Sequence, residues 1–343
     1  MRHGTLTEVI PLSVLDLAMV PNGATSTEAF AQTTQVARAA ERLGYSRIWV
    51  AEHHNMATVA STVPAVLMAH LAANTTSIKV GSGGVMLPNH APLAIAEQFA
   101  MLEALYPGRV DMGVGRAPGT DGSTAMALRG ARNDPNAEDF PRNLIEVMGL
   151  LGDVRKENGL WERFKATPVA TSSPSVIPLG SSNFSAQLAG LLGLPFGFAH
   201  HFDMGGTIDA VEAYHEAFRP SPILDEPYTI VTASTIAAET TEQAQWLSGP
   251  ALLRRYGLRT GRIGPMLTPE QAVDHPDFAA ASTMRVSALV GTADEVTAGM
   301  RELAKHTGAS ELMLYTSTYG LAERVNSLER IADAWGLEAV TET

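Results

Sequence analysis

Eight times along the chain, a short apolar segment typical of a β-strand is followed by apolar residues at helical spacing. Strands that alternate with helices form a parallel sheet covered by helices, and eight such units close into a barrel. The 343 residues fit one such barrel. The sequence therefore predicts an α/β fold, a (β/α)8 TIM barrel with loop insertions, as a single domain over 1–343. The strand segments are 9–17, 47–51, two within 78–116, 176–179, 195–199, 228–236 and 312–316.

Three segments interrupt this alternation. Residues 117–141 are rich in Gly, Pro, Asn and Asp and are long for a connection, so we interpret them as an excursion loop. Residues 152–174 are irregular and predict a small insertion. Residues 249–283 carry four arginines, and we expect a lid that attracts an anionic ligand to the barrel mouth. The alternative is an ordered helical insertion whose arginines pair with surface carboxylates.

The charge of the chain restricts its partners. With 24 basic and 36 acidic residues the formal net charge is −12, which disfavours nonspecific binding to nucleic acid or to anionic lipid. We find neither a signal-peptide core nor an apolar run of the ~20 residues that a membrane span needs. Cysteine is absent, so neither disulfides nor thiolate chemistry contribute. We expect a cytoplasmic protein.

Polar motifs occur where the predicted strands end. Active sites of α/β barrels form at the carboxyl ends of the strands, so this placement indicates an enzyme. The motifs are Glu-His-His at 52–54, Gly-Gly at 83–84, Gly-Arg at 115–116, Gly-Ser-Ser at 180–182, His-His at 200–201 and Thr-Ser-Thr-Tyr at 316–319.

The histidines could be catalytic, structural or metal ligands. Because His53 and His54 are adjacent on a strand, their side chains point to opposite faces and only one can readily enter the barrel mouth. A metallohydrolase barrel is the alternative, since imidazole is a common zinc ligand. The chain contains no His-x-His pair, so we predict no metal site.

Arg116 lies at the end of the fourth strand and suits a phosphate dianion. Backbone N–H groups of the Gly-Ser-Ser segment, ahead of the helix near Ser185, offer a second anion site that the helix dipole assists. The alternatives are a surface salt bridge for Arg116 and an ordinary N-cap for Ser182 or Ser185.

Three segments carry a resemblance to a known family. The segments RIWVAEHHN, VGSGGVMLPNHAPLAIAEQFAMLEALYPGRVDMGVGRAPGTD and LGSSNFSAQLAGLLGLPFGFAHH resemble the bacterial luciferase-like family of flavin-dependent monooxygenases. The resemblance implies a TIM barrel that binds FMN at its mouth, with the FMN reduced by a separate NAD(P)H:flavin reductase. Reduced flavin and O2 then form a flavin C4a-(hydro)peroxide, which oxygenates a small organic substrate.

The resemblance also implies roles for individual residues. His53 matches the catalytic histidine of the family, and His200 falls where the luciferases carry an aromatic residue near the flavin. Gly115 falls where they carry a cysteine, and both departures argue against light emission from a long-chain aldehyde. The implied cofactor-binding residues are Gly83, Gly84, Arg116, Ser181, Ser182 and Ser185.

Three functions stay open at the level of sequence. The first is a two-component FMN monooxygenase, and the second is a deazaflavin-dependent oxidoreductase that transfers hydride. The third is a flavin-binding protein without turnover. Homodimerisation through helices is a further expectation from the family, and the identity of the substrate is not encoded in these motifs.

Overall fold

In the computed structural model, which describes residues 9–129, 139–202 and 205–340, eight parallel strands close a barrel. The neighbour order is β6-β5-β4-β3-β2-β1-β9-β7, and β6 pairs with β7 to complete the circle. The predicted barrel is therefore confirmed. Its strands are β1 (Leu12–Asp16), β2 (Arg47–Val50), β3 (Lys79–Met86), β4 (Val110–Gly115), β5 (Ser175–Gly180), β6 (Phe196–Phe198), β7 (Thr229–Ala238) and β9 (Glu311–Tyr315).

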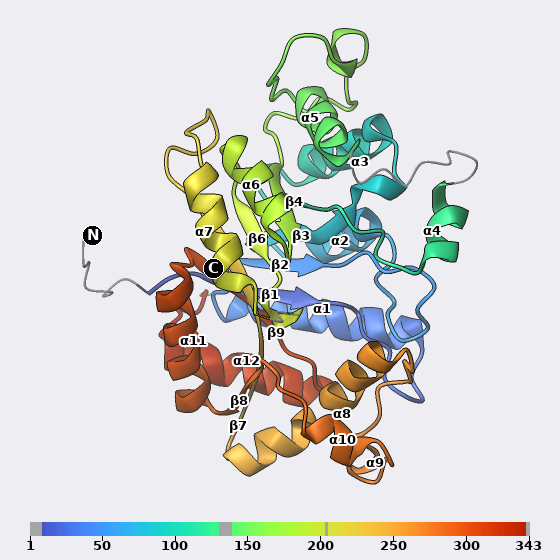
Figure 1. Ribbon diagram of the computed structural model, residues 1–343, viewed down its shortest axis with the longest axis vertical. Coiled ribbons are helices and arrows are strands. Elements are labelled where there is room, and N and C mark those ends of the chain that lie inside the picture. The colour runs from blue at the N-terminus through green and yellow to red at the C-terminus, as the bar shows by residue number, and fades with distance from the viewer. Residues whose placement is uncertain (1–8, 130–138, 203–204, 341–343) are drawn as a thin grey trace.

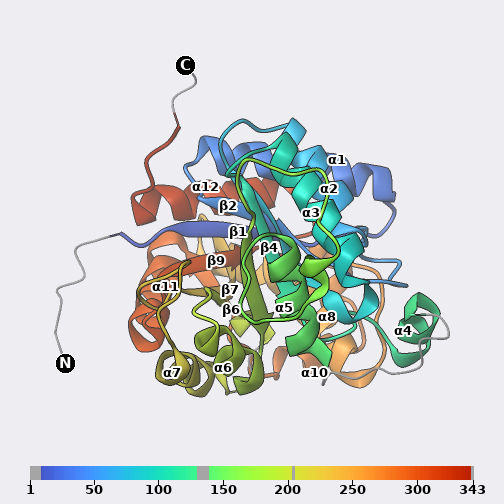
Figure 2. The same cartoon turned by 90° about the horizontal axis from the view of Figure 1, so that it is seen from above.

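Helices surround the strands (Figure 1, Figure 2). Two of them begin with capping boxes, in which Thr25 pairs with Glu28 and Thr292 with Glu295. Among the described residues no helix is both long and apolar enough to cross a membrane. The surrounding helices are α1 (Ser26–Arg42), α2 (Pro64–Ala73), α3 (Pro92–Leu105), α5 (Phe140–Leu150), α6 (Asn183–Leu191), α7 (Thr207–Ala217), α11 (Ala293–Thr307) and α12 (Leu321–Trp335).

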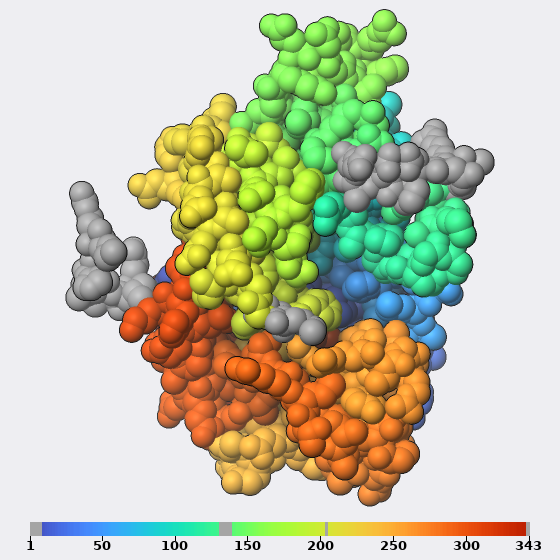
Figure 3. All heavy atoms as spheres, in the orientation of Figure 1, coloured from blue at the N-terminus to red at the C-terminus, as the bar shows by residue number. Residues whose placement is uncertain are grey.

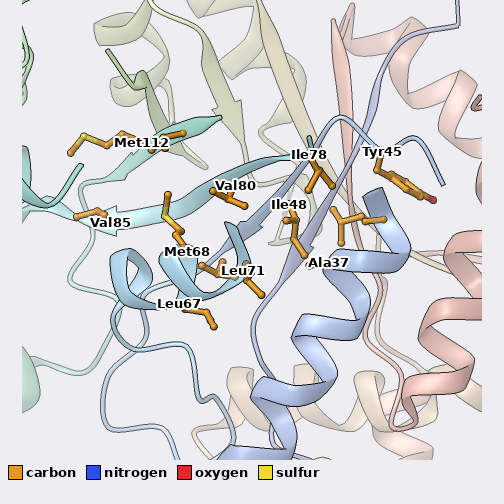
Figure 4. Packing of buried hydrophobic residues seen from close by; sticks show 14 of the residues in the cluster. Ala37, Tyr45, Ile48, Leu67, Met68, Leu71, Ile78, Val80, Val85 and Met112 are labelled. Carbon is orange, nitrogen blue, oxygen red and sulfur yellow. The ribbon is translucent and has the colours of Figure 1, made fainter. Parts of the chain in front are cut away.

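The main hydrophobic core lies between the helices and the outer face of the barrel. Figure 4 shows side chains of α1 and α2, among them Ala37 and Leu71, directed at strand residues such as Ile48 and Val80. All four are buried. This layer removes the apolar helix faces from water and fixes where each strand ends.

The interior of the barrel holds a charged network near the amino ends of the strands. Arg47 donates to Asp111 Oδ2 at 2.7 Å and to both oxygens of Glu311, at 2.8 and 2.9 Å. Trp49 Nε1 donates to Asp111 at 3.0 Å, and the Tyr228 hydroxyl donates to Glu311 at 2.7 Å. Burial alone would lower the pKa of Arg47, but the two carboxylates raise it above its ordinary value.

One strand was not predicted. β8 (Leu289–Thr292) pairs with Thr235–Ala238 in the second half of β7, whereas Ile230–Ser234 in the first half pairs with β9. Only the first half of β7 therefore belongs to the closed barrel, and the second half continues beyond it with β8 alongside.

The 249–283 segment, for which we expect a lid or a helical insertion, contains regular helices. The segment lies largely in α8 (Thr241–Thr260), α9 (Pro269–Val273) and α10 (Phe278–Ser282). In Figure 3 these helices form a block, coloured orange, below the yellow-green α6 and α7. The segment is helical, as the alternative expected, but of its four arginines Arg262 pairs with Asp277 while Arg254, Arg255 and Arg259 line a cavity. Closure of the segment as a lid stays a prediction.

The other two insertions agree more closely with expectation. The excursion loop 117–141 contains one helix, α4 (Gly122–Arg129), and residues 130–138 lie outside the described part of the chain. Between 152 and 174 the chain is irregular apart from the short 3-10 helix η3 (Leu160–Glu162).

Candidate active site

His53 follows the carboxyl end of β2. Its Nδ1 lies 3.2 Å from the carbonyl oxygen of Gly119. Because a carbonyl oxygen only accepts hydrogen bonds, Nδ1 carries the proton in the neutral ring and Nε2 is left as an acceptor. Burial lowers the pKa of His53, the Gly119 bond opposes this, and the charge of Arg254 lowers it further. His53 is therefore a neutral base near pH 7, with Arg254 close by.

Glu52, its neighbour, was not predicted as a site residue. It is fully buried and accepts from Nε2 of His54 and of His90, both at 2.9 Å, and from the Met86 N–H at 3.0 Å. Burial raises the pKa of Glu52, but these hydrogen bonds together bring it below its ordinary value. The sequence offered two signals for Glu52 as a site residue: it directly precedes His53, and His90 lies in the next loop. Among the described residues no group of three or more His, Asp and Glu side chains could hold a metal ion.

The loop after β4 is fastened over the end of β2. Thr120 Oγ1 donates to the His54 carbonyl at 2.9 Å, and Asn89 Nδ2 donates to the Pro118 carbonyl at 3.0 Å. At Gly119 φ is +67°, and a Cβ there would lie 2.6 Å from the Glu52 carbonyl oxygen. Only glycine allows this contact, so the loop that positions His53 is held closely.

The Gly83–Gly84 peptide in β3 is cis. A Cβ at Gly84 would lie 2.5 Å from the side chain of Leu179, and one at Gly81 would lie 2.4 Å from the indole of Trp49. The flat group that closely approaches the strand at Gly81 is therefore the indole of Trp49. The contact of Gly83 and Gly84 with a cofactor stays a prediction.

Arg116 and the serine segment lie at one corner of the mouth. The guanidinium of Arg116 stacks over the ring of Phe184, in the first turn of α6, with 4.5 Å from Cζ to the ring centroid. Ser182 is the N-cap residue of α6, but its side chain makes no capping hydrogen bond. Ser185 is buried, Ser182 half-buried and Ser181 exposed. A cation therefore stands beside a helix N-terminus whose N–H groups lack a side-chain cap, which suits an anion.

The two histidines after β6 have different surroundings. They lie in the short helix η4 (His200–Phe202), where His200 Nδ1 is 2.7 Å from Thr207 Oγ1. His201 is buried and lines a cavity, and His200 is not part of that lining. Burial lowers the pKa of His201 to about 3, although a hydrogen bond with the Thr232 backbone opposes the shift. The sequence analysis gave His200 as a candidate catalytic residue, whereas in the structure His201 is the residue that lines the cavity.

The cavity beside His201 has a volume of about 490 Å³. It lies between the carboxyl ends of β7 and β9 and the helix α8, and Arg254 and Ser317 are among the residues in its wall. Arg254 is also the residue whose charge acts on His53. The cavity therefore adjoins the candidate catalytic histidine. The arginines of α8 and the Thr-Ser-Thr-Tyr motif were visible in the sequence, but nothing there placed them together.

Comparison with known proteins gives consistent matches over nearly the whole chain. A family model described as luciferase-like monooxygenase matches residues 10–311. The Bacillus subtilis protein YvbT, described as uncharacterized, is 45% identical over 94% of this chain and 96% of its own. A luciferase-like monooxygenase of Escherichia coli is 40% identical over 95% and 97%. An N-acetyl-S-alkylcysteine monooxygenase of B. subtilis is 30% identical over 95% and 98%.

Solved structures share the fold. The crystal structure of apo-MsnO8 has a TM-score of 0.89 at 34% identity and covers 96% of this chain and 100% of its own. The oxygenating constituent of 3,6-diketocamphane monooxygenase from Pseudomonas putida, in complex with FMN, has a TM-score of 0.70 at 19% identity, covering 95% and 98%. An F420-dependent secondary alcohol dehydrogenase has a TM-score of 0.70 at 15% identity, covering 96% and 99%. The last two likenesses show the fold alone.

Proposed function

The chain belongs to the luciferase-like monooxygenase family, and from that premise we propose that it is the FMN-dependent oxygenase of a two-component system. Its co-substrates are reduced FMN and O2, and its substrate is a small organic molecule. The observation that supports FMN as the cofactor is the corner where Arg116 stacks on Phe184 at the N-terminus of α6, which has no side-chain cap. A phosphate dianion fits a planar cation beside free N–H groups.

The other proposed flavin contacts lie along the mouth from this corner. Ser181, Ser182 and Ser185 belong to the same turn and first helical turn as the phosphate corner. The backbone of Gly83 and Gly84 in β3 is the proposed contact for the flavin ring. An FMN complex in a protein of the same fold supports this arrangement. When bound, reduced FMN supplies the electrons and the reaction with oxygen, and the protein positions and shields it.

His53 is proposed to control a proton in the reaction. Its neutral ring presents Nε2 as an acceptor because Nδ1 is held by the Gly119 carbonyl. A base of lowered pKa stays unprotonated at neutral pH and can accept a proton there. The loop around Gly119 covers the end of β2 and helps exclude water from the site. His200 is the second candidate for this role.

Two partners follow from the proposal. A separate NAD(P)H:flavin reductase supplies reduced FMN, so the chain with NADPH and oxidised FMN alone should consume no oxygen. A second copy is the other partner, because α2 and α3 expose Val66, Met101 and Leu105, which are 68%, 54% and 60% exposed. Light scattering measures the mass in solution, and a monomer mass would contradict the dimer.

Anaerobic titration with reduced FMN, followed by mixing with oxygen, tests the proposal. Arg116→Ala should weaken FMN binding by about 1.5–3 kcal/mol, the scale of a charge-assisted hydrogen bond. Riboflavin, which lacks the phosphate, should bind wild type and variant alike. Arg42→Ala is the matched control, since Arg42 pairs with Glu329 on the surface. Unchanged FMN affinity in Arg116→Ala would reject the phosphate site, and preference for deazaflavin without oxygen uptake would reject the function.

The role of His53 is tested separately from binding. His53→Ala should retain FMN affinity but release hydrogen peroxide in place of oxygenated product, because proton control is lost rather than anchoring. Peroxide and product are measured from the same reaction. The same measurement on His200→Ala ranks the two histidines, and wild-type coupling in His53→Ala would remove His53 from the mechanism.

A further inference from the structure

The cavity between β7, β9 and α8 is strongly cationic. Its wall includes Arg254, Arg255 and Arg259, and among its described lining residues none is an aspartate or a glutamate. This concentration of positive charge occurs in a chain of net charge −12. No ion pair with an acid of the described chain neutralises Arg254 or Arg259. The field inside the cavity therefore favours a negatively charged occupant.

Buried polar atoms without a partner gather in the same wall. Among the described residues, the buried side-chain atoms without a hydrogen bond include His201 Nδ1, Arg254 Nε, Tyr315 Oη and Ser317 Oγ. His201, Tyr315 and Ser317 are only 6%, 9% and 7% exposed. A buried polar group without a partner costs about 1–3 kcal/mol, so four of them around one cavity call for a ligand that satisfies them.

The chemistry of these atoms selects an acceptor ligand. The guanidinium N–H of Arg254 and the hydroxyls of Tyr315 and Ser317 all donate hydrogen bonds. A carboxylate offers two acceptor oxygens and matches the planar fork of an arginine. Arg255 is already engaged, since its Nη1 donates to the His201 carbonyl at 3.0 Å. Arg254 is half-buried and Arg259 exposed, which leaves Arg254 as the inner cation and Arg259 at the opening.

The rest of the wall is apolar. Leu252, Met284 and Val286 line the cavity together with the donors, and its volume of about 490 Å³ is that of a site for a small organic molecule. A ligand that fills it needs one anionic end and an apolar body.

We propose that this cavity binds a small organic carboxylate with an apolar chain, held at its anionic end by Arg254, Tyr315 and Ser317. Resting on the proposed function, the inference names the substrate class of the enzyme as organic acids rather than neutral aldehydes or alkanes. The flavin phosphate corner belongs to β4 and α6, whereas this cavity belongs to β7, β9 and α8, so the two anion sites lie on different elements of the mouth.

Calorimetric titration of the full chain without flavin tests the proposal. Octanoate is compared with octanamide, which has the same length and shape but no charge. Octanoate should bind at least about tenfold more tightly, because only the anion gains from the arginines. Equal affinity for the two probes, or no saturable binding of octanoate, would overturn the proposal.

Variants assign the effect to individual residues. Arg254→Gln should abolish the preference for octanoate, and Arg254→Lys should restore part of it. Tyr315→Phe removes only a hydroxyl that has no partner among the described residues, so the variant should fold normally and bind octanoate about threefold to tenfold more weakly. The control is Arg262→Gln, since Arg262 pairs with Asp277 in the same segment outside the lining, and its octanoate affinity should be unchanged.

FMN titration of the same variants separates this inference from the proposed function. Arg254→Gln should bind FMN like wild type, whereas Arg116→Ala should not. Loss of FMN affinity in Arg254→Gln equal to that in Arg116→Ala would make the arginine cluster a flavin phosphate site and overturn the carboxylate assignment. If no variant or wild type binds FMN, the proposed function fails while a measured preference for octanoate stands.

Discussion

Both ends of the barrel interior contain buried polar side chains, but the two ends differ in how many of these side chains have hydrogen-bond partners. At the amino end, Arg47 is bonded to Asp111 and Glu311, and only Asp111 Oδ1 lacks a partner in that network. At the carboxyl end, donors of Tyr315 and Ser317 have no partner among the described residues. The first group is satisfied within the protein apart from that one oxygen, whereas the second group would be satisfied by the proposed ligand.

This difference separates stability from function. Buried charges that satisfy one another hold strands together, and removing one member leaves the others unpaired. Buried donors that face a cavity without a partner lower stability, by about 1–3 kcal/mol each, until they bind something. Substitutions at the two ends should therefore have opposite profiles: loss of folding stability at the amino end and loss of ligand binding at the carboxyl end.

The largest expected effect breaks the network at the amino end. Arg47→Leu leaves Asp111 and Glu311 buried without a cation, which should lower the free energy of unfolding by about 3–5 kcal/mol. Urea denaturation measures it. Arg42→Leu is the control, because its ion pair with Glu329 is exposed and should contribute under about 1 kcal/mol. Equal effects of the two substitutions would mean that the network does not stabilise the barrel.

A pair of tyrosines sharpens the comparison with one hydroxyl at each end. Tyr228→Phe removes a donor to the Glu311 carboxylate and should cost about 1.5–3 kcal/mol of unfolding free energy. Tyr315→Phe removes a buried hydroxyl without a partner among the described residues, so the free energy of unfolding should stay unchanged or rise by up to about 1–3 kcal/mol. Thermal and urea unfolding of both variants measure the two effects. Equal losses of unfolding free energy would refute the distinction between the two ends.

The smallest effect is a dependence of stability on pH that arises at the carboxyl end. His201 has a pKa of about 3 in the folded chain against an ordinary 6.5, so between these values only the unfolded chain binds the proton. Unfolding free energy therefore falls as pH drops below 6.5. From there to about pH 5, wild type should lose roughly 1–2 kcal/mol more than His201→Gln. Parallel pH profiles for the two proteins would contradict a buried neutral His201.

The barrel could be predicted because its strands repeat one pattern, an apolar run that ends in polar residues. β8 escaped prediction because it pairs beyond the closed barrel and falls outside the eight repeats. The sequence left the helices of the 249–283 segment as an alternative because Gly249 and Pro250 lie inside α8, and both residues normally weaken a helix. Both are buried in the structure, and Gly249 faces Phe278 of α10. Tertiary packing therefore outweighs the local cost.

The candidate site was only partly accessible from sequence. Strand alternation places His53, because it follows β2 closely, but it cannot rank His200 and His201, since β6 ends at Phe198 and the pair lies in a 3-10 helix. The proximity of Arg254 to His53 joins residues from opposite halves of the chain and arises only when the barrel closes. The contact of Glu52 could not be predicted from sequence for the same reason, because its partner His90 comes from a different loop.

The divided pairing of β7 also has a consequence for how such a protein can diverge. The proposed flavin contacts all precede β7 in the chain, whereas most of the arginine-lined wall lies between β7 and β9. A single recombination crossover within β7 would therefore separate the segment with the proposed flavin contacts from most of the proposed carboxylate site. Under these two proposals, such a crossover exchanges the carboxylate site and keeps the flavin contacts.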